Sequence, residues 1–125
     1  MQIGKFDFKE DFQYEAIINY SYICLMPKLY EYLGLIILFY SNDHEPIHVH
    51  GKYQGMESKA EVIFVDGVFR EIAITEVKGK KPLDSKNLKN FRIFVETFRD
   101  EIVIKWIDYF VYNKPIQSEV ITKKL

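Results

Sequence analysis

A chain of 125 residues, 48% of them hydrophobic, is long enough to bury one core and too short for two ordinary domains, so we expect a single domain over residues 1–125. The net charge of −1 gives no overall attraction to nucleic acid or to an anionic membrane. The single cysteine, Cys24, excludes a disulfide within the chain and fits a reducing compartment. The N-terminal residues lack the apolar core of a signal peptide, and the apolar run Leu35–Tyr40 is too short to cross a bilayer. We therefore expect a cytoplasmic protein without a membrane span.

The chain divides by pattern into an N-terminal extension (residues 1–25), a core (26–112) and a tail (113–125). Apolar residues in the extension fit a strand as well as a helix, and we favour a short helix near Gln13–Tyr20. The chain has nine tyrosines and ten phenylalanines. Because aromatic side chains bury large areas and are enriched at interfaces, this content fits either an aromatic core or a surface for a homodimer or another protein partner.

The first half of the core predicts an antiparallel sheet. Short apolar or alternating segments are separated by residues that favour turns. The clearest turn is Asp66-Gly67, because glycine readily adopts the positive φ that a two-residue hairpin turn requires. We expect a meander of four to five strands, with segments at Leu29–Leu33, Leu35–Ser41, Ile47–Tyr53, Lys59–Val65 and Val68–Val77.

The second half of the core predicts one long helix. Apolar residues recur every three or four positions from Leu88 to Tyr109, which gives a continuous apolar stripe. Asp84 or the following serine can cap the start, and Pro115 lies just beyond the end, so the helix is expected at about Ser85–Tyr112. The predicted fold class is α+β: an antiparallel β-meander packed against one long C-terminal helix.

All three histidines, His44, His48 and His50, lie within seven positions. Residues i and i+2 of a strand point to the same face, so a strand here places His48 and His50 side by side, with Val49 facing inward. The segment Asn42–Pro46 has the composition of a turn, which can bring His44 back toward the pair.

Three interpretations of this cluster remain open. In the first, His44, His48 and His50 bind one divalent transition metal, zinc in the first place, with Asp43 as a ligand or as a partner that orients an imidazole. In the second, His48 and His50 are a catalytic acid–base pair that works without metal, as cleavage of a phosphodiester requires. In the third, the histidines belong to a solvated turn and edge strand that caps backbone groups or meets a partner.

A set of short motifs is spread over Met26–Tyr112. They are Met26-Pro27, Gly34-Leu35-Ile36-Ile37, Phe39-Tyr40-Ser41-Asn42-Asp43-His44, Pro46, His48-Val49-His50, Ala60, Arg99-Asp100-Glu101 and Trp106. This set resembles a small bacterial family catalogued as domain of unknown function number 4160. The family often has Pro-Pro before the first paired histidine, where this chain has Pro46-Ile47. The resemblance implies a small cytoplasmic prokaryotic or phage protein with a suggested toxin–antitoxin role, and it implies no established activity.

A run of basic residues lies between the predicted sheet and the predicted helix. Its members are Lys78, Lys80, Lys81, Lys86, Lys89 and Arg92, with only Asp84 as an acidic residue among them. The run fits weak binding to the phosphates of RNA or DNA, but we favour a solvated surface, because charge runs are commonly solubilising.

These features support two functions of different classes. One is a small metal-dependent phosphodiesterase or ribonuclease, in which the histidines form the site and the basic run holds the phosphate backbone. The other is a non-enzymatic protein-binding module, such as one half of a toxin–antitoxin pair, in which the histidine stretch is a recognition edge. An enzyme requires the imidazoles to converge in a pocket, whereas a binding module does not.

Overall fold

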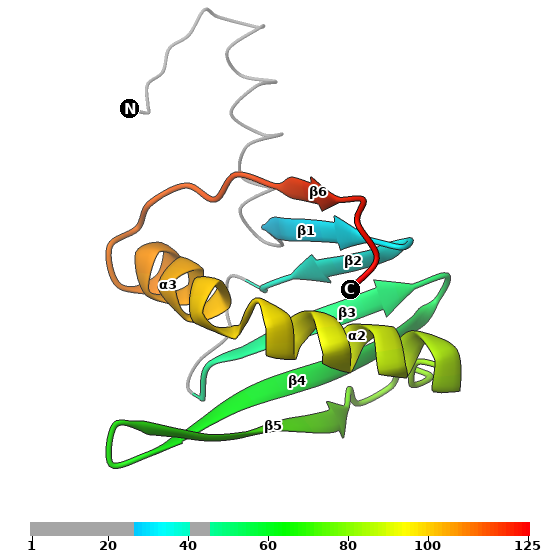
Figure 1. The fold of residues 1–125 in the computed structure, drawn as a ribbon, viewed down its shortest axis with the longest axis horizontal. Helices are drawn as coiled ribbons and strands as arrows, with labels where there is room; N and C mark the ends of the chain where they lie inside the picture. The colour runs from blue at the N-terminus through cyan, green and yellow to red at the C-terminus, as the bar shows by residue number, and fades with distance from the viewer. Residues whose placement is uncertain (1–26, 41–45) are drawn as a thin grey trace, which may run out of the picture.

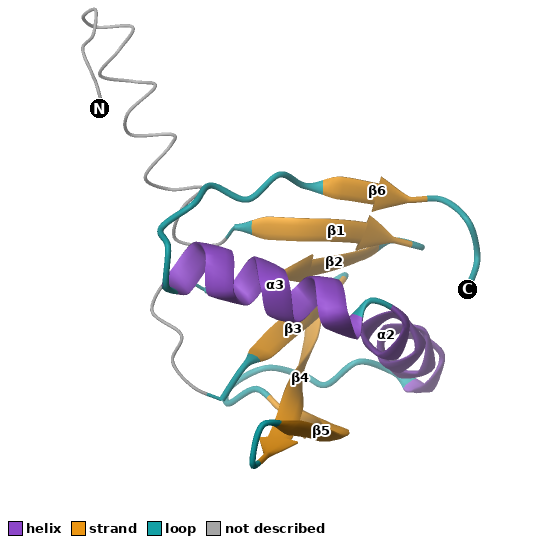
Figure 2. Cartoon of the chain, turned by 60° about the vertical axis from the view of Figure 1, so that its left-hand side comes forward, coloured by secondary structure: helices purple, strands orange, loops and turns teal. Residues whose placement is uncertain are grey.

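The computed structural model describes residues 27–40 and 46–125. At its centre is a six-stranded sheet in the order β5-β4-β3-β2-β1-β6 (Figure 1). The strands are β1 (Lys28–Tyr32), β2 (Leu35–Leu38), β3 (His48–Tyr53), β4 (Met56–Val65), β5 (Val68–Glu76) and β6 (Glu119–Ile121). Two helices, α2 (Ser85–Thr97) and α3 (Arg99–Phe110), follow β5 and precede β6 in the chain, and both lie across one face of the sheet (Figures 1 and 2).

The strands β1 to β5 form an antiparallel meander, as the sequence predicts. The last strand, β6, differs, because it pairs in parallel with β1 and places Glu119 beside Tyr30. The Lys105 ammonium of α3 holds the same glutamate at 3.2 Å. The predicted antiparallel meander of four to five strands is therefore incomplete: the sheet is mixed and has a sixth strand, three residues long, in the segment expected as a tail.

Three two-residue turns set the register of the meander. Both central residues of each turn have positive φ, the geometry of the type I′ turn that matches the twist of paired strands. The turns are Leu33-Gly34 (φ 50° and 84°), Gln54-Gly55 (45° and 85°) and Asp66-Gly67 (53° and 78°). The Asp66-Gly67 hairpin confirms the prediction. The Gln54-Gly55 turn starts β4 at Met56, three residues before the predicted start.

The predicted long helix is two helices, which corrects the sequence interpretation. The chain bends at Phe98, whose φ of −103° and ψ of 18° separate α2 from α3. Its ring lies 5.4 Å from the ring of Tyr30 and stacks 4.5 Å from that of Phe94. The apolar residues keep their helical spacing through the bend, because both helices pack on the same sheet face. Spacing alone therefore indicates one helix.

The core fills the space between the helices and one face of the sheet. Its fully buried side chains include Tyr30, Leu35 and Val49 from the strands and Phe91 and Phe94 from α2. The strand β3 and α2 come close together: a Cβ atom at Gly51 would lie 2.7 Å from ring carbons of Phe91. A glycine is therefore required at this position for α2 to pack as it does.

Some predicted features lie outside the described residues. These are the helix near Gln13–Tyr20, Cys24, and most of the turn that carries Asp43 and His44. Among the helices formed by residues 27–40 and 46–125, none has the length and apolar content needed to cross a membrane.

Replacing Gly51 with alanine tests the contact between β3 and α2. The added methyl group meets the Phe91 ring, and overpacking of this kind costs about 1–3 kcal/mol. Urea denaturation followed by tryptophan fluorescence should show that loss. A Gly51→Ala/Phe91→Leu double variant should lose less free energy of unfolding than the two single variants lose in sum, because the smaller leucine leaves space for the added methyl group. Strict additivity would contradict the contact.

Tyr30 predicts a pH dependence of stability. Its buried hydroxyl donates to Glu101 Oε1 at 3.1 Å, and burial, followed by the Glu101 charge, raises the pKa of the phenol above its ordinary value. In the unfolded chain a tyrosine ionises near pH 10, so above about pH 10 the unfolded state binds fewer protons than the folded state. Stability therefore falls as the pH rises through this range.

The measurement is urea denaturation from pH 8 to pH 11 of the wild-type chain and of Tyr30→Phe. Above pH 10 the free energy of unfolding of the wild-type chain should fall more steeply, by up to about 1.4 kcal/mol per pH unit, than that of the variant. Equal slopes for the two chains would contradict the assignment to Tyr30.

Candidate functional site

The strand β3 places two histidines on one face of the sheet. Val49 is fully buried under the helices and pairs with Ala60 in the core. His48 and His50, on either side of it, leave the strand on the other side, and their ring centroids lie 5.2 Å apart. His48, at the start of β3, still reaches Trp106 of α3. The alternation predicted from the sequence is therefore confirmed for these three residues.

A buried glutamate holds the second histidine. His50 Nδ1 lies 2.9 Å from Glu57 Oε2, and the Tyr40 hydroxyl donates to the same oxygen at 2.9 Å. His50 is 6% exposed and Glu57 is 1% exposed. The Tyr40 ring also meets the His50 ring edge to face at 4.5 Å. These contacts fix the imidazole in both position and rotation.

The first histidine is held by backbone and by an aromatic ring. His48 Nδ1 lies 2.7 Å from the carbonyl oxygen of Pro46, and the imidazole packs 5.3 Å from the ring of Trp106 on α3. Like His50, it is 6% exposed. Both histidines therefore belong to a packed site rather than to a solvated edge strand.

The hydrogen bonds define the tautomer of both rings. A carbonyl oxygen can only accept, so Nδ1 of His48 carries the hydrogen. The Glu57 carboxylate likewise accepts from Nδ1 of His50. In a neutral imidazole the lone pair is then on Nε2, the atom that binds a metal ion or a proton. Both histidines have the same tautomer for the same reason.

The position of Glu57 depends on segments that are distant in sequence. The Gln54-Gly55 turn sets it opposite Lys52 in the ladder between β3 and β4. The chain between β5 and α2 then returns to β4, where the Glu57 backbone N–H donates to the Lys81 carbonyl at 2.8 Å. Among residues 27–40 and 46–125, Glu57 Oε1 has no hydrogen-bond partner, although it is buried.

Sequence reasoning missed Glu57 and Tyr40 as members of the site. Glu57 lies between the expected strand segments Ile47–Tyr53 and Lys59–Val65 and was assigned to neither, because Gln54-Gly55 was not recognised as a hairpin turn. The sequence feature that could have indicated Glu57 is an acidic residue seven positions after His50, on the other side of a two-residue turn. The predicted carboxylate, Asp43, and the third histidine, His44, lie outside the described residues. Within the described part of the chain, no group of three or more His, Cys, Asp or Glu side chains is placed to hold a metal ion.

The basic run is divided by the fold. Lys78, Lys80 and Lys81 are exposed in the connection before α2, next to the strand that carries Glu57. Lys86 and Lys89 are exposed on α2, which packs on the sheet face opposite the histidines. Arg92 is engaged with the Ile72 carbonyl at 3.4 Å. The six residues therefore do not form one continuous surface beside the histidine pair.

The comparisons with known proteins agree with the residue pattern. The model of the family described as domain of unknown function DUF4160 matches residues 34–107, which is more than half of the chain. The chain therefore belongs to the DUF4160 family, and the matched region includes β2 to β5, both histidines of β3, α2 and most of α3. No curated protein and no solved structure matches the chain.

The tautomers can be measured directly. Long-range ¹H–¹⁵N correlation spectra at alkaline pH should show the hydrogen on Nδ1 in both His48 and His50, with His44 assigned from a His44→Ala sample. In the Glu57→Gln variant, the preference of His50 for the Nδ1–H tautomer should weaken. His48 should keep the Nδ1–H tautomer, because its acceptor, the Pro46 carbonyl, is unchanged. Hydrogen on Nε2 of either ring in the wild-type chain would contradict the described hydrogen bonds.

Proposed function

We propose that His48 and His50 bind one divalent transition-metal ion through their Nε2 atoms, and that the ion activates water to hydrolyse a phosphodiester. The observation that carries the proposal is the pair of Nδ1 hydrogen bonds, one to a carboxylate and one to a backbone carbonyl. Histidines that bind metals almost always donate their other ring N–H to such acceptors, which orients the ring and makes it a better ligand.

The spacing of the rings supports the same conclusion. Two imidazoles bound through Nε2 to one tetrahedral ion, with metal–nitrogen bonds of about 2.0–2.1 Å, place their ring centroids roughly 5 Å apart. The centroids of His48 and His50 are 5.2 Å apart. Zinc is the first candidate, because neutral imidazole nitrogen suits it and it has no redox chemistry of its own.

The remaining metal ligands are proposed to lie in the short segment 41–45, because the residues that flank it contact the site. Tyr40 hydrogen-bonds to Glu57, and the Pro46 carbonyl accepts from His48, so the residues on both sides of 41–45 contact the site. His44 is two positions from Pro46, and we assign it as the third ligand. Asp43 is the candidate for a fourth ligand or for a partner that orients His44.

The electrostatics of Glu57 also favour a bound cation. Burying an ionised carboxylate is costly unless positive charge or hydrogen-bond donors compensate it. Glu57 Oε2 accepts from His50 and Tyr40, while Oε1 is buried without a hydrogen-bond partner among the described residues. A metal ion on the far side of the His50 ring would add the compensating charge.

An ion held by His48 and His50 would supply Lewis-acid activation of water at neutral pH. The same ion can polarise a phosphoryl oxygen. The substrate class is proposed from Lys78, Lys80 and Lys81, which the bond from the Glu57 N–H to the Lys81 carbonyl keeps beside the strand of the site. These lysines are exposed and can meet neighbouring phosphates.

A protein-binding module with the histidine stretch as its recognition edge is less well supported. His48 and His50 are each 6% exposed, which leaves little imidazole surface for a partner. The tip of the β4–β5 hairpin is a more accessible apolar surface, since Val65 is 42% and Val68 is 65% exposed. A toxin–antitoxin partner, or a second copy in a homodimer, would bind there rather than at the histidines.

The experiment is zinc titration by calorimetry on tag-free, chelator-treated protein. We expect one site per chain. Because partners that orient a ligand contribute 10–100-fold to metal affinity, Glu57→Gln should weaken binding by about that factor, and His48→Ala/His50→Ala should abolish it. Lys52→Ala, on the same strand and face, is the matched control and should bind as the wild type does.

His44→Ala tests the third ligand in the same titration and should also weaken binding. Hydrolysis of bis(p-nitrophenyl) phosphate should then depend on added metal and on both β3 histidines. Absence of zinc, nickel and manganese binding to the wild-type chain would contradict the proposal. Hydrolysis that persists in chelator and still needs both histidines would replace it with the metal-free acid–base pair.

A further inference from the structure

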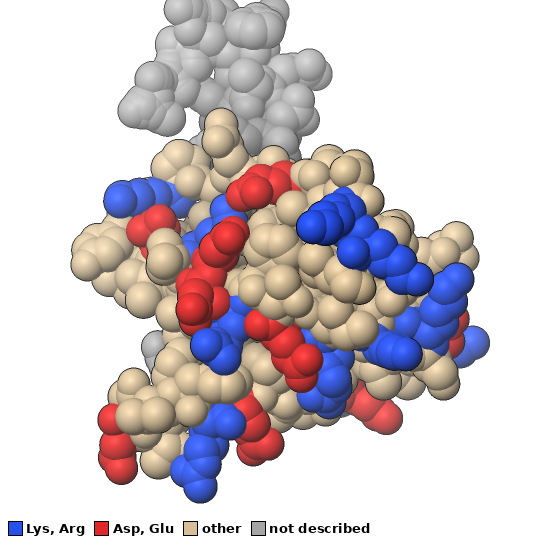
Figure 3. Space-filling view, in the orientation of Figure 1, with Lys and Arg blue, Asp and Glu red and all other residues tan. Residues whose placement is uncertain are grey.

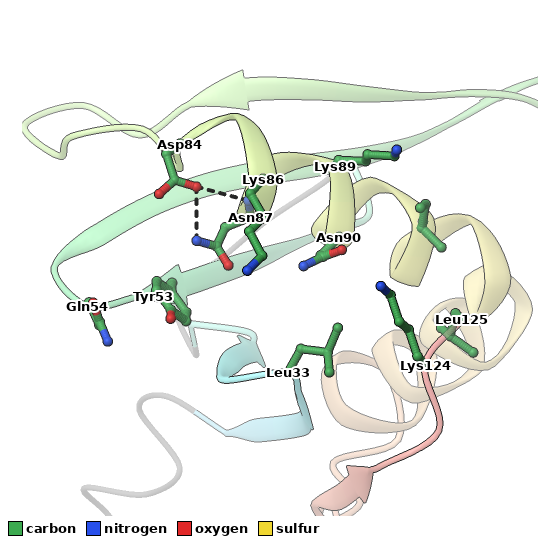
Figure 4. Close-up of a pocket in the computed structure, with 11 residues that line it drawn as sticks. Leu33, Tyr53, Gln54, Asp84, Lys86, Asn87, Lys89, Asn90, Lys124 and Leu125 are labelled. Atoms are coloured by element: carbon green, nitrogen blue, oxygen red, sulfur yellow. Dashed lines mark hydrogen bonds between the residues drawn. The ribbon is translucent and has the colours of Figure 1, made fainter.

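A hollow lies on the helix side of the sheet, at the opposite end of β3 from the histidines. It has a volume of about 870 Å³, within the usual range for small-molecule sites. It is open between the first half of α2, the turns that follow β1 and β3, and the end of the chain (Figure 4). Its lining residues are Leu33, Tyr53, Gln54, Asp84, Lys86, Asn87, Lys89, Asn90, Ile93, Lys124 and Leu125.

The lining is positively charged. Three lysines, Lys86, Lys89 and Lys124, stand against one acidic side chain, Asp84. The Asp84 carboxylate is already engaged, because it accepts from the backbone N–H and from the side-chain amide of Asn87, both at 2.9 Å. Figure 3 shows lysine and arginine side chains gathered on this side of the molecule, over the start of α2 and the C-terminal segment.

Three nitrogen-bearing side chains point into the hollow from two segments. Lys86 and Asn90 are one turn apart on α2, so they project from the same helix face. Lys124 enters from the C-terminal segment, which is anchored where the Leu125 N–H donates to the Tyr32 hydroxyl at 2.9 Å. Figure 4 shows Lys86, Asn90 and Lys124 directed toward the same space, whereas Lys89 runs along the helix.

The rest of the lining is apolar or aromatic. Leu33, at the β1–β2 turn, is 43% exposed, and Ile93 continues the α2 wall. The Tyr53 ring lies against Gly34, where a Cβ atom would be 2.8 Å from its edge. The hollow thus combines cationic and amide donors with an apolar and aromatic wall, the two chemistries that a phosphate group and a flat ring require.

We propose that this hollow binds a nucleotide, with its phosphates between Lys86, Asn90 and Lys124 and its base against Tyr53 and Leu33. Ammonium and amide groups donate hydrogen bonds to phosphate oxygens, and a base can stack on an aromatic ring. The site is separate from the histidine pair, which lies at the start of β3 and on the other sheet face. Binding here therefore does not depend on the proposed metal.

The test is calorimetric titration of the full chain with ADP, with adenosine and inorganic phosphate as the two part-ligands. ADP should bind at least 10-fold more tightly than either part. Lys86→Gln/Lys124→Gln should lose at least 10-fold in ADP affinity. Lys78→Gln/Lys123→Gln, which also removes two positive charges but at positions outside the lining, is the matched control and should keep wild-type affinity.

His48→Ala/His50→Ala should bind ADP as the wild type does, which separates this inference from the metal proposal. The inference is overturned if no ADP binding is detected at millimolar concentration, or if the Lys86/Lys124 variant binds as well as the control. It is also overturned if single-stranded RNA binds while ADP does not, because the basic side chains would then serve a polymer backbone.

Discussion

The strand β3 has to satisfy two constraints at once, and the rest of the structure depends on how it does so. One face must come close enough to α2 for Phe91 to lie over Gly51, where no Cβ atom fits. The other face carries His48 and His50. Because side chains alternate strictly along a strand, a shift of one residue would place both imidazoles under the helices and Val49 on the opposite face. The packing of α2 therefore fixes the position of the histidines.

The second organising contact is the Glu57 carboxylate. It lies at the point where three segments meet: the end of β2, the strand β3 and the connection that leads to α2. A buried carboxylate adds no hydrophobic stabilisation, and an apolar side chain of similar size would cost less to bury. A role in orienting His50 accounts for its presence where packing alone does not.

The sequence predicted what depends on local pattern. The alternation around Val49, the Asp66-Gly67 turn and the apolar stripe of the helices could all be read from neighbouring residues. It did not predict what depends on segments meeting in space. Gln54 has a positive φ of 45°, which is uncommon for glutamine, so the turn that brings Glu57 to His50 had no clear signal. The bend is at Phe98, whose ring packs against that of Tyr30 on β1. The strand β6 forms where the C-terminal tail returns to pair with β1.

The same distinction applies to charge. The basic run looked like one feature because its members are close in sequence, yet the fold puts part of it in the loop near Glu57 and part of it on α2. Lys124, from the far end of the chain, joins the α2 group instead. We therefore propose two sites of different chemistry, whereas the sequence left the basic run open as either a phosphate-binding surface or a solvated one.

We propose that His48 and His50 are ligands of one metal ion, and that Glu57 orients His50 and the Pro46 carbonyl orients His48 from outside the coordination shell. X-ray absorption spectroscopy of the zinc-loaded protein tests this most directly. We expect at least two imidazole nitrogens at about 2.0 Å from zinc, with the multiple-scattering pattern of histidine rings, and the loss of that pattern in His48→Ala/His50→Ala. A shell made only of oxygen ligands, or imidazole scattering that survives the double substitution, would contradict the account.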